Sequence, residues 1–282
     1  MQYQTTLRDA IAFEGAGLHT GQPASVRVLP APAGHGLRFR LNGPSGAVDF
    51  PARAEYVVDT VRATVVGKDG RTVSTVEHLL SALLGCGVDN ALIEVEGPEI
   101  PVEDGSAKVF ADRITAAGLT TLHEARVRWI PTETRVFHDG DKLLIVAPAP
   151  AFRVRMIVDY RAPVGVQYVD AAITTEAYRA EIAPNRTFGF QDEIDDLIRR
   201  GLAKGGTLEN AVVFGPDGPL APLRSPDEPA RHKVLDLVGD FALLGAYPQC
   251  EVIAIKSGHK LHCTAVRELS PPGESSAVSA TS

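Results

Sequence analysis

A short piece of sequence occurs twice, and it constrains the fold more than any other feature of the chain. Ala82-Leu-Leu-Gly85 recurs 160 residues later as Ala242-Leu-Leu-Gly245. Each copy ends a segment whose apolar side chains have helical spacing, and each is followed by a strand pattern and a glycine, at 92–97 and 252–258. The matched order of helix, turn and strand indicates a duplicated domain.

Periodicity and the Gly/Pro punctuation predict the same order of elements in both halves, sheet first and helices later. The first half is predicted to contain strands at 25–29, 37–41, 63–66 and 91–96, then helices at 76–84 and 107–117. The second half is predicted to contain strands at 129–137, 142–147, 152–159 and 251–255, and helices at 173–182, 192–200 and 230–244. We expect the boundary between the halves near 123–128.

Composition excludes several classes of protein. Apolar residues make up 44% and charged residues 22%, as in globular chains, and the net charge of -7 without a basic run argues against nucleic acid or an anionic membrane as a partner. The longest nearly apolar run, 79–88, is about half of a bilayer span. The first thirteen residues lack the layout of a signal peptide, so we expect a soluble, cytoplasmic protein. Three cysteines without a C-x-x-C pair predict reduced thiols.

The predicted helix at 230–244 carries one polar face. His232, Asp236 and Asp240 are spaced four apart, with Lys233 beside them, and the apolar side chains point the other way. Residues four apart have Cβ atoms about 5 to 6 Å from each other, which lets an imidazole and a carboxylate reach one ion. The alternative is a solvated face with a His–Asp contact and a Lys233 salt bridge of at most about 1 kcal/mol.

A third ligand donor lies on the predicted helix at 76–84, where His78 projects away from the apolar face and Glu77 lies on the flank. Two imidazoles and one carboxylate leave an open position on zinc, and an adjacent carboxylate such as Glu77 suits a general base. His259, after a Ser-Gly turn, is a further candidate that Asp240 would orient. The alternatives are a capping box formed by Ser74 and Glu77, a solvated His78 and a merely exposed His259.

Eight segments, in one order along the chain, resemble the motifs of a single enzyme family. They are Gly15-Ala-Gly-Leu-His-Thr-Gly21, Ser74-Thr-Val-Glu-His-Leu-Leu80, Gly87-Val-Asp-Asn90, Pro98-Glu-Ile-Pro-Val-Glu-Asp-Gly-Ser106, Arg186-Thr-Phe-Gly-Phe190, Gly205-Gly-Thr-Leu-Glu-Asn210, Asp227-Glu228 with Arg231-His-Lys-Val-Leu-Asp236, and Lys256-Ser-Gly-His259. From about Thr6 to His259 the chain is similar to the zinc-dependent UDP-3-O-acyl-N-acetylglucosamine deacetylases of bacterial lipid A biosynthesis.

The resemblance implies a role for ten residues. It implies zinc ligands at His78, His232 and Asp236, the general base at Glu77, an acid or electrostatic partner at His259 with Asp240 hydrogen-bonded to it, groups near the developing oxyanion at Lys233 and Thr187, and substrate contacts at Phe188 and Lys256, the latter for the diphosphate. Amide hydrolysis passes through a tetrahedral anion, so such donors have a chemical purpose.

The resemblance also implies an α+β fold of two similar domains, each a sheet layered against helices, with the active site between them. We expect domains at 1–125 and 126–269 and a disordered tail at 270–282. The implied cofactor is Zn²⁺, with Fe²⁺ as the alternative. The implied substrate is a UDP-linked acylated glucosamine, handled by a monomer without nucleic acid and without stable membrane insertion.

In such enzymes an insert in the second domain forms an apolar passage for the acyl chain, which we expect around 188–213. Its lining candidates, which are equally consistent with an ordinary amphipathic helix, are Phe190, Ile194, Leu197, Ile198 and Leu202. Two stretches depart from the family pattern, Tyr160-Arg-Ala-Pro163 and Lys260-Leu-His262 after His259. We expect them to affect nucleotide or acyl recognition, and we expect no role for His262.

Two other functions fit part of the pattern. Two histidines and a carboxylate also form the facial triad of non-haem iron oxygenases, although those ligands usually lie on barrel strands and His232 and Asp236 have helical spacing. A noncatalytic sugar-nucleotide-binding relative would more naturally have lost Glu77 or a ligand, and all four residues are present.

Overall fold

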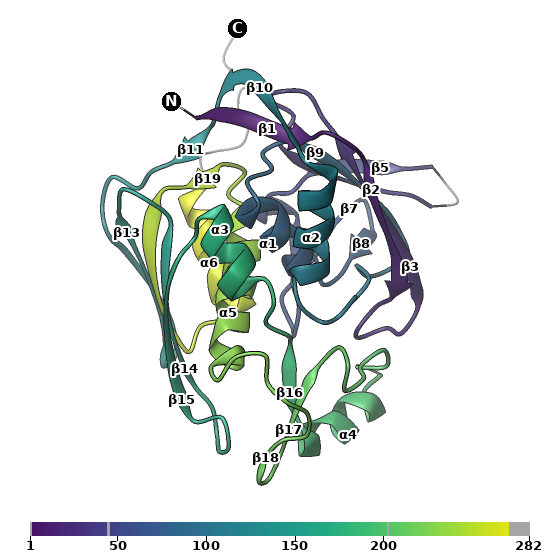
Figure 1. The fold of residues 1–282 in the computed structure, drawn as a ribbon, viewed down its shortest axis with the longest axis vertical. Helices are drawn as coiled ribbons and strands as arrows, with labels where there is room; N and C mark the ends of the chain where they lie inside the picture. Colours follow the sequence, from purple (N-terminus) through teal and green to yellow (C-terminus); the bar gives the residue numbers. More distant parts are fainter. Residues whose placement is uncertain (1, 44–45, 202, 271–282) are drawn as a thin grey trace, which may run out of the picture.

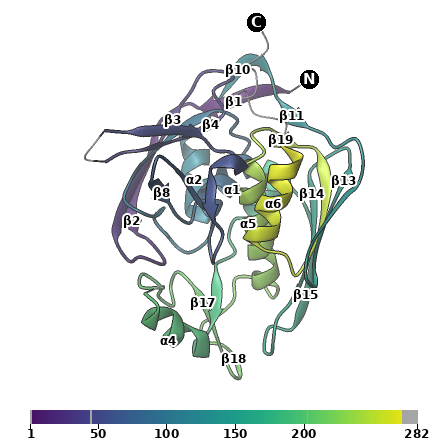
Figure 2. The same cartoon turned by 180° about the vertical axis from the view of Figure 1, so that it is seen from behind.

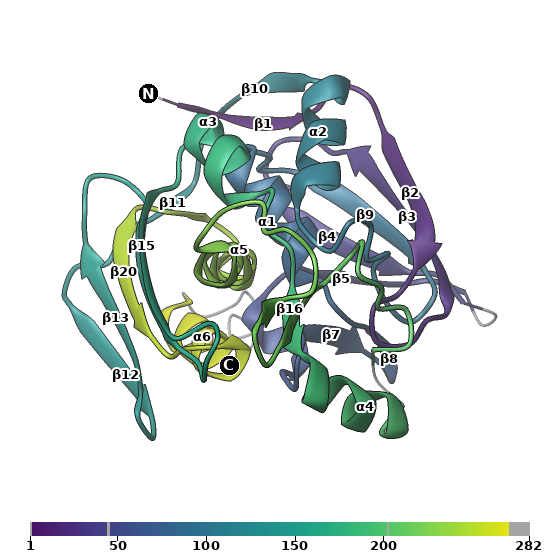
Figure 3. The same ribbon diagram turned by 60° about the horizontal axis from the view of Figure 1, so that its bottom comes forward.

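The computed structural model describes residues 2–43, 46–201 and 203–270, and the predicted tail lies almost entirely outside this part of the chain. Its fold is α+β, with two similar domains, each a five-stranded sheet layered against helices (Figure 1). The central helices lie between the two sheets (Figure 3). Among the described residues, no helix has both the length and the hydropathy to cross a membrane.

The sheet of the first domain has the strand order β2-β3-β9-β4-β5. Only the β4–β9 pair is parallel. Its strands are β2 (Ile11–Ala16), β3 (Pro23–Pro30), β4 (Leu37–Leu41), β5 (Val48–Pro51) and β9 (Ala91–Glu96). Side chains alternate between core and exterior along each strand, so that Ala91, Ile93 and Val95 of β9 are buried. Helices α1 (Glu77–Gly85) and α2 (Lys108–Ala117) belong to this domain and pack against each other.

The sheet of the second domain has the order β12-β13-β20-β14-β15, and again only one inner pair, β14–β20, is parallel. Its strands are β12 (Arg135–Asp139), β13 (Lys142–Pro148), β14 (Arg153–Asp159), β15 (Val166–Ala172) and β20 (Cys250–Ile255). Helix α5 (Glu228–Ala242) precedes β20 as α1 precedes β9, and α6 (His259–Leu269) follows it. The shared topology confirms the duplication that the sequence indicated.

Helices α1 and α5 lie side by side at the centre of the molecule, seen in Figure 1 and from behind in Figure 2. Gly239 makes this close approach feasible, because a Cβ at that position would lie 2.1 Å from the carbonyl oxygen of Glu77 on α1. The first residue of α1 is therefore held against the last turn of α5. This contact brings the polar residues of the two domains together.

A small unit projects beyond the two sheets at the lower end of the molecule in Figure 1. Strands β16 (Phe188–Phe190) and β17 (Val212–Gly215) pair in parallel, α4 (Gln191–Arg199) connects them, and β18 (Gly218–Pro219) pairs with β17. The unit occupies the stretch in which the acyl-passage insert was predicted. Phe190, Val212 and Phe214 form a small core of its own together with Val164.

The remaining elements are short and join the larger layers. They are β1 (Tyr3–Leu7) paired with β10 (Leu119–Ala125), β11 (Arg128–Trp129) paired with β19 (Tyr247–Pro248), the three-stranded sheet of β6 (Val57–Asp59), β7 (Val65–Lys68) and β8 (Arg71–Val73), the 3-10 turn Ala54–Tyr56, α3 (Thr175–Ala177), and the π-helical turn Tyr178–Ile182.

Four expectations about elements need correction. The single strand predicted at 129–137 is two strands in different sheets, because Pro131 has no N–H to donate to a ladder. The strand expected from Ala63 begins at Val65, since the N–H of Thr64 bonds to the Glu77 carboxylate instead. The capping box is absent: Val76 precedes α1 without a side-chain cap. His259 opens a helix, where the sequence predicted a loop residue.

Candidate metal centre and active site

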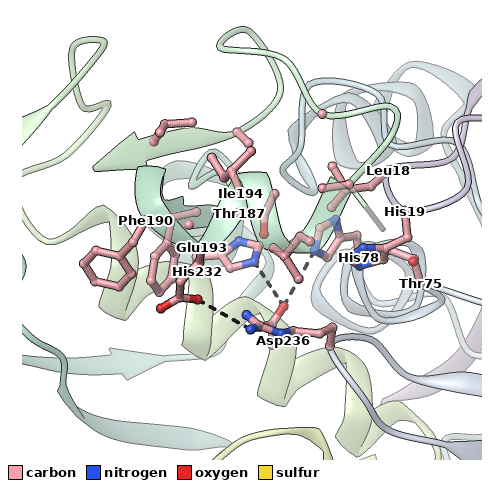
Figure 4. A pocket seen from close by; sticks show the side chains of 18 of the residues that line it. Leu18, His19, Thr75, His78, Thr187, Phe190, Glu193, Ile194, His232 and Asp236 are labelled. Atoms are coloured by element: carbon pink, nitrogen blue, oxygen red, sulfur yellow. Dashed lines mark hydrogen bonds and ion pairs between the residues drawn. The ribbon is translucent and has the colours of Figure 1, made fainter. Parts of the chain in front are cut away.

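Two imidazoles, one from each domain, converge on one carboxylate oxygen. The Oδ1 atom of Asp236 lies 3.6 Å from Nε2 of His78 and 3.3 Å from Nε2 of His232 (Figure 4). It is buried and has no hydrogen-bond partner among the residues that the structure describes. The imidazole rings of His78 and His232 stand edge to face, 5.0 Å apart. These three residues, which we call the ligand cluster, meet at a common point as predicted from their positions on two helices.

The local structure of α5 explains why two members of the cluster share a face. His232 and Asp236 are one turn apart, and apolar neighbours such as Leu235 and Val238 are fully buried on the other side. The Nδ1 of His232 lies 3.1 Å from the carbonyl oxygen of Asn185, to which it donates. That hydrogen bond fixes the tautomer and leaves Nε2 free to bind a cation.

The protonation states of the cluster suit a cation. Burial lowers the pKa of His232 to about 4, so its ring is neutral near pH 7. Burial would raise the pKa of Asp236, but the positive charge that His232 acquires at low pH and the charge of Lys233 hold it well below its usual range. The other oxygen of Asp236 accepts a hydrogen bond of 2.7 Å from Nζ of Lys233. Two imidazoles and one carboxylate with an unpartnered buried oxygen fit a divalent cation such as Zn²⁺ or Fe²⁺.

Glu77 lies next to the ligand cluster and is buried. Its Oε2 accepts a hydrogen bond of 3.0 Å from the backbone N–H of Thr64, and its Oε1 is 3.7 Å from Nε2 of His259. Burial raises the pKa of the Glu77 carboxyl, while the histidines at 259 and 78 oppose that shift. A carboxylate with a raised pKa is a stronger base near neutral pH, as general-base catalysis requires.

His259 is held by Asp240, as expected. Its Nδ1 lies 2.9 Å from Oδ2 of Asp240 and its ring lines the cavity. Burial alone would lower the pKa of His259, but the charges of Asp240 and Glu77 raise it to about 9. Burial would likewise raise the pKa of Asp240, and the His259 charge lowers it to about 2. The pair is therefore an imidazolium beside a carboxylate.

A cavity of about 500 Å³ opens in front of these groups (Figure 4). One end is polar and is formed by Glu77, the ligand cluster, Lys233, Thr187 and His259. The other end is apolar and is formed mainly by the small unit that contains α4. Its lining there includes Phe188, Phe190, Ile194, Leu197, Leu208 and Val213. The cavity can therefore hold a molecule with a polar head and an apolar tail.

The structure brings most of the predicted site residues to this cavity. Thr187 lines it, and the Phe188 ring stands edge to face with His232 at 6.3 Å. Lys256 does not line it, and its Nζ pairs with Asp159 at 2.8 Å and with Asp141 at 3.1 Å. Of the predicted acyl-passage residues, Phe190, Ile194 and Leu197 line the cavity. The side chain of Ile198 and the whole of Leu202 fall outside the described part of the chain.

Sequence reasoning missed several residues that shape the site. Glu99 is fully buried and accepts hydrogen bonds from the backbone N–H groups of His19 and Thr20 and from the Thr75 hydroxyl. Thr75 adopts a φ of 59°, which is strained for a β-branched residue and places that strain two residues before Glu77. The glycine-flanked motif 15–21 indicated the loop that contains His19 and Thr20, but no periodicity indicated that Glu99 binds this loop.

Comparison with known proteins identifies the family. A sequence model of the LpxC family, described as UDP-3-O-acyl N-acetylglycosamine deacetylase, matches residues 4–271. The chain belongs to the LpxC family. Two curated relatives are named UDP-3-O-acyl-N-acetylglucosamine deacetylase. The relative from Geotalea uraniireducens is 39% identical, over 96% of this chain and 94% of the relative's length. The relative from Trichormus variabilis is 44% identical, over 92% of this chain and 95% of the relative's length.

Membership of the LpxC family agrees with the chemistry of the site. A family of deacetylases needs a means to activate water and a place for an acylated sugar, and the cavity has donors for a cation at one end and an apolar lining at the other. The coverage of nearly the whole chain means that both domains, and hence both halves of the ligand cluster, belong to the shared architecture. The iron oxygenase alternative is not favoured.

Proposed function

We propose a mechanism for the reaction of this metal-dependent hydrolase, which removes the N-acetyl group of UDP-3-O-(3-hydroxyacyl)-N-acetylglucosamine and releases acetate in lipid A biosynthesis. The single observation that carries the mechanism is the unpartnered Oδ1 of Asp236 facing two imidazole nitrogens, with Glu77 beside it at the polar end of the cavity. Family membership supplies the substrate.

The proposed metal ligands are His78, His232 and Asp236, and the proposed cation is Zn²⁺, with Fe²⁺ as the alternative. When bound, the cation would polarise the acetamide carbonyl and lower the pKa of a water molecule in the site. Lys233 holds Asp236 as a carboxylate through its 2.7 Å hydrogen bond, and Asn185 keeps the ring of His232 in the tautomer that can bind a metal.

Glu77 is the proposed general base. The Thr64 N–H fixes one of its oxygens and leaves the other towards His259 and the cavity. From there the carboxylate takes a proton from the attacking water as the C–O bond forms. The tetrahedral anion that results carries its charge on the former acetyl oxygen.

Lys233 and Thr187 are the proposed donors to that anion, since both line the polar end of the cavity. A single donor of this kind typically contributes about 3 to 4 kcal/mol to the barrier reduction. The C–N bond then breaks, and the leaving amine needs a proton. His259 is placed to supply it or to stabilise its transfer from Glu77, because Asp240 favours the imidazolium and orients Nε2 towards Glu77.

The substrate's other groups have places in this scheme. The acyl chain is proposed to lie along the apolar end of the cavity, against Phe190, Ile194 and Leu197. Phe188 is a proposed sugar or acyl contact at the junction of the two ends. Lys256 stays the proposed partner of the diphosphate, which must then compete with Asp141 and Asp159 for its ammonium group.

We propose domain limits of 1–125 and 126–269, because each five-stranded sheet is drawn from one side of that boundary. We also propose a monomer, because a single chain contributes all members of the ligand cluster and the whole polar end of the cavity. Sedimentation of the metal-loaded protein tests the second proposal, and a dimer that loses activity on dilution would contradict it.

The test of the function is an acetate-release assay with a UDP-3-O-acyl-N-acetylglucosamine substrate. The wild-type protein should release acetate after reconstitution with Zn²⁺ or Fe²⁺. The Glu77→Gln variant should keep its metal and lose roughly 10²- to 10⁴-fold in kcat. Glu94→Gln is the matched control, because that carboxylate pairs with Arg27 and Arg40 on a strand remote from the cavity. Full activity in Glu77→Gln would refute the mechanism.

A further inference from the structure

A chain of buried polar side chains lies behind His259, on the side away from the cavity. It consists of Thr64, Asp240, Ser257 and His262, which we call the rear network. Thr64, Asp240 and His262 are fully buried, and Ser257 is nearly so. None of the four lines the cavity, and none belongs to the ligand cluster. Of this group, the proposed mechanism uses only the Asp240 side chain and the backbone N–H of Thr64.

His262 has a partner for each ring nitrogen. Its Nδ1 lies 2.8 Å from Oδ2 of Asp240, and its Nε2 lies 2.8 Å from the hydroxyl oxygen of Ser257. A carboxylate can only accept, so Nδ1 carries the hydrogen and donates it. Burial lowers the pKa of His262, and in the neutral ring Nε2 accepts from the Ser257 hydroxyl. Asp240 thereby fixes the tautomer, and the Ser257 hydroxyl, which can rotate to donate, satisfies the remaining ring nitrogen.

Asp240 is held by three donors from two parts of the chain, Thr64 and helix α6. Its Oδ2 accepts from His262 and from Nδ1 of His259, at 2.8 and 2.9 Å. Its Oδ1 accepts from the Thr64 hydroxyl at 2.6 Å. Two donors therefore share one carboxylate oxygen, and the carboxylate cannot rotate towards or away from His259 without breaking a buried hydrogen bond. Leaving a buried donor or acceptor without a partner is costly, so this arrangement is rigid.

From this geometry we propose that His262 is a positioning residue for the deacetylation: it holds Asp240, which in turn holds His259 with Nε2 3.7 Å from Glu77. The inference rests on the proposed function. It replaces the expectation from the sequence that His262 has no role. It also explains how a departure from the family pattern at 260–262 acts on the site without touching the substrate.

The same three side chains have another interpretation, a second cation site formed by Asp240, His259 and His262, whose donor atoms lie within 4.8 Å of one another. That interpretation is disfavoured because the Nδ1 atoms of both histidines already donate to Asp240 and its other oxygen accepts from Thr64. No oxygen or nitrogen among these three residues is among the buried atoms left without a partner. The ligand cluster, in contrast, contains such an atom.

The experiment compares two substitutions of His262. In His262→Leu the donor to Asp240 is lost, and we expect kcat to fall by roughly 10- to 100-fold, the cost of a small misplacement of a reacting group, with KM nearly unchanged. In His262→Asn the side-chain nitrogen occupies the place of Nδ1 and can donate to Asp240, so kcat should recover most of the loss. Both variants should bind as much metal as the wild type.

Two further measurements separate positioning from stability. In an Asp240→Asn background, His262→Leu should lower kcat no further, because the Asp240 carboxylate through which His262 acts on His259 is already absent. Should His262→Leu fail to fold, Ser257→Ala takes its place. It leaves Nε2 of His262 without its buried partner and so loosens the hold of the ring on Asp240, which should lower kcat severalfold without altering KM.

The outcomes distinguish this inference from the proposed function. A wild-type protein that releases no acetate with either metal would refute both the proposed function and the role of His262. An active wild type with unchanged kcat in His262→Leu, or an equal loss of kcat for His262→Leu in the wild-type and Asp240→Asn backgrounds, overturns the role of His262 alone.

Discussion

The contact between α1 and α5 at Gly239 provides the sharpest test of how the two domains build the site. In Gly239→Ala, the added Cβ would lie 2.1 Å from the carbonyl oxygen of Glu77 and 2.9 Å from its Cα, where ordinary contacts begin at 3.4 Å. Both atoms belong to helix backbone, so neither can rotate away. The helices must separate locally by about 1.3 Å, which is the shortfall from 3.4 Å.

That separation acts directly on the site, because α1 carries Glu77 and His78 while α5 carries His232 and Asp236. Overpacking of this kind typically lowers the free energy of unfolding by about 1 to 3 kcal/mol. Alanine in place of a helical glycine raises it by about 1 kcal/mol through its higher helix propensity. We therefore expect a modest loss of stability, up to about 2 kcal/mol. A displacement of about 1 Å between reacting groups can cost on the order of 10²-fold in rate, so activity should suffer far more than folding.

The assay measures three quantities on the same preparation: the free energy of unfolding in urea, the metal bound per chain after dialysis, and kcat for acetate release. Gly15→Ala is the control, since its Cβ would meet only Pro101 Cβ, at 3.4 Å, and adds the same methyl group. We expect Gly239→Ala to fold, to bind metal more weakly and to lose most of its activity, with Gly15→Ala close to wild type. Wild-type metal binding and turnover in Gly239→Ala would refute the reasoning.

Three more predictions follow from buried and cavity-lining groups. Burial raises the pKa of Cys86 and Cys250 to about 12, so their thiols should react with a disulfide reagent at pH 8 only when urea unfolds the chain, and rapid reaction of the native protein would contradict this. Ile194→Trp should narrow the apolar end of the cavity and raise KM by about tenfold for a long acyl chain and less for a short one, as steady-state kinetics would show. Arg186→Ala should lower the free energy of unfolding by about 3 to 5 kcal/mol in urea melts, because it leaves Glu228 buried without its charged partner.

The sequence predicted the ligand cluster because its signal is local. His232 and Asp236 lie one helical turn apart, and His78 stands out on its own helix as a polar residue opposite an apolar face. Short-range periodicity suffices for such features. The duplicated pattern then supplied the relation between the two helices, and the paired topologies of the two sheets confirm it.

The parts that could not be predicted depend on contacts between residues far apart in the chain. The Glu77 carboxylate was a candidate for a helix cap, but it accepts a hydrogen bond from the N–H of Thr64. The Thr64 hydroxyl donates to Asp240, which lies 176 residues further along the chain. Strand β15 was missed because two of its largest apolar side chains, Val166 and Tyr168, point outward at the edge of the sheet. In each case tertiary contacts outweigh the local pattern.

We infer that His78 of the first domain and His232 and Asp236 of the second bind one divalent cation. X-ray absorption spectroscopy of the metal-loaded protein tests it most directly, together with metal analysis of the wild type and of His78→Ala and His232→Ala. We expect one metal per chain with two imidazoles bound to it, and the loss of one imidazole signal or of the metal in either variant. A metal bound without histidine, or an unchanged first shell in both variants, would contradict it.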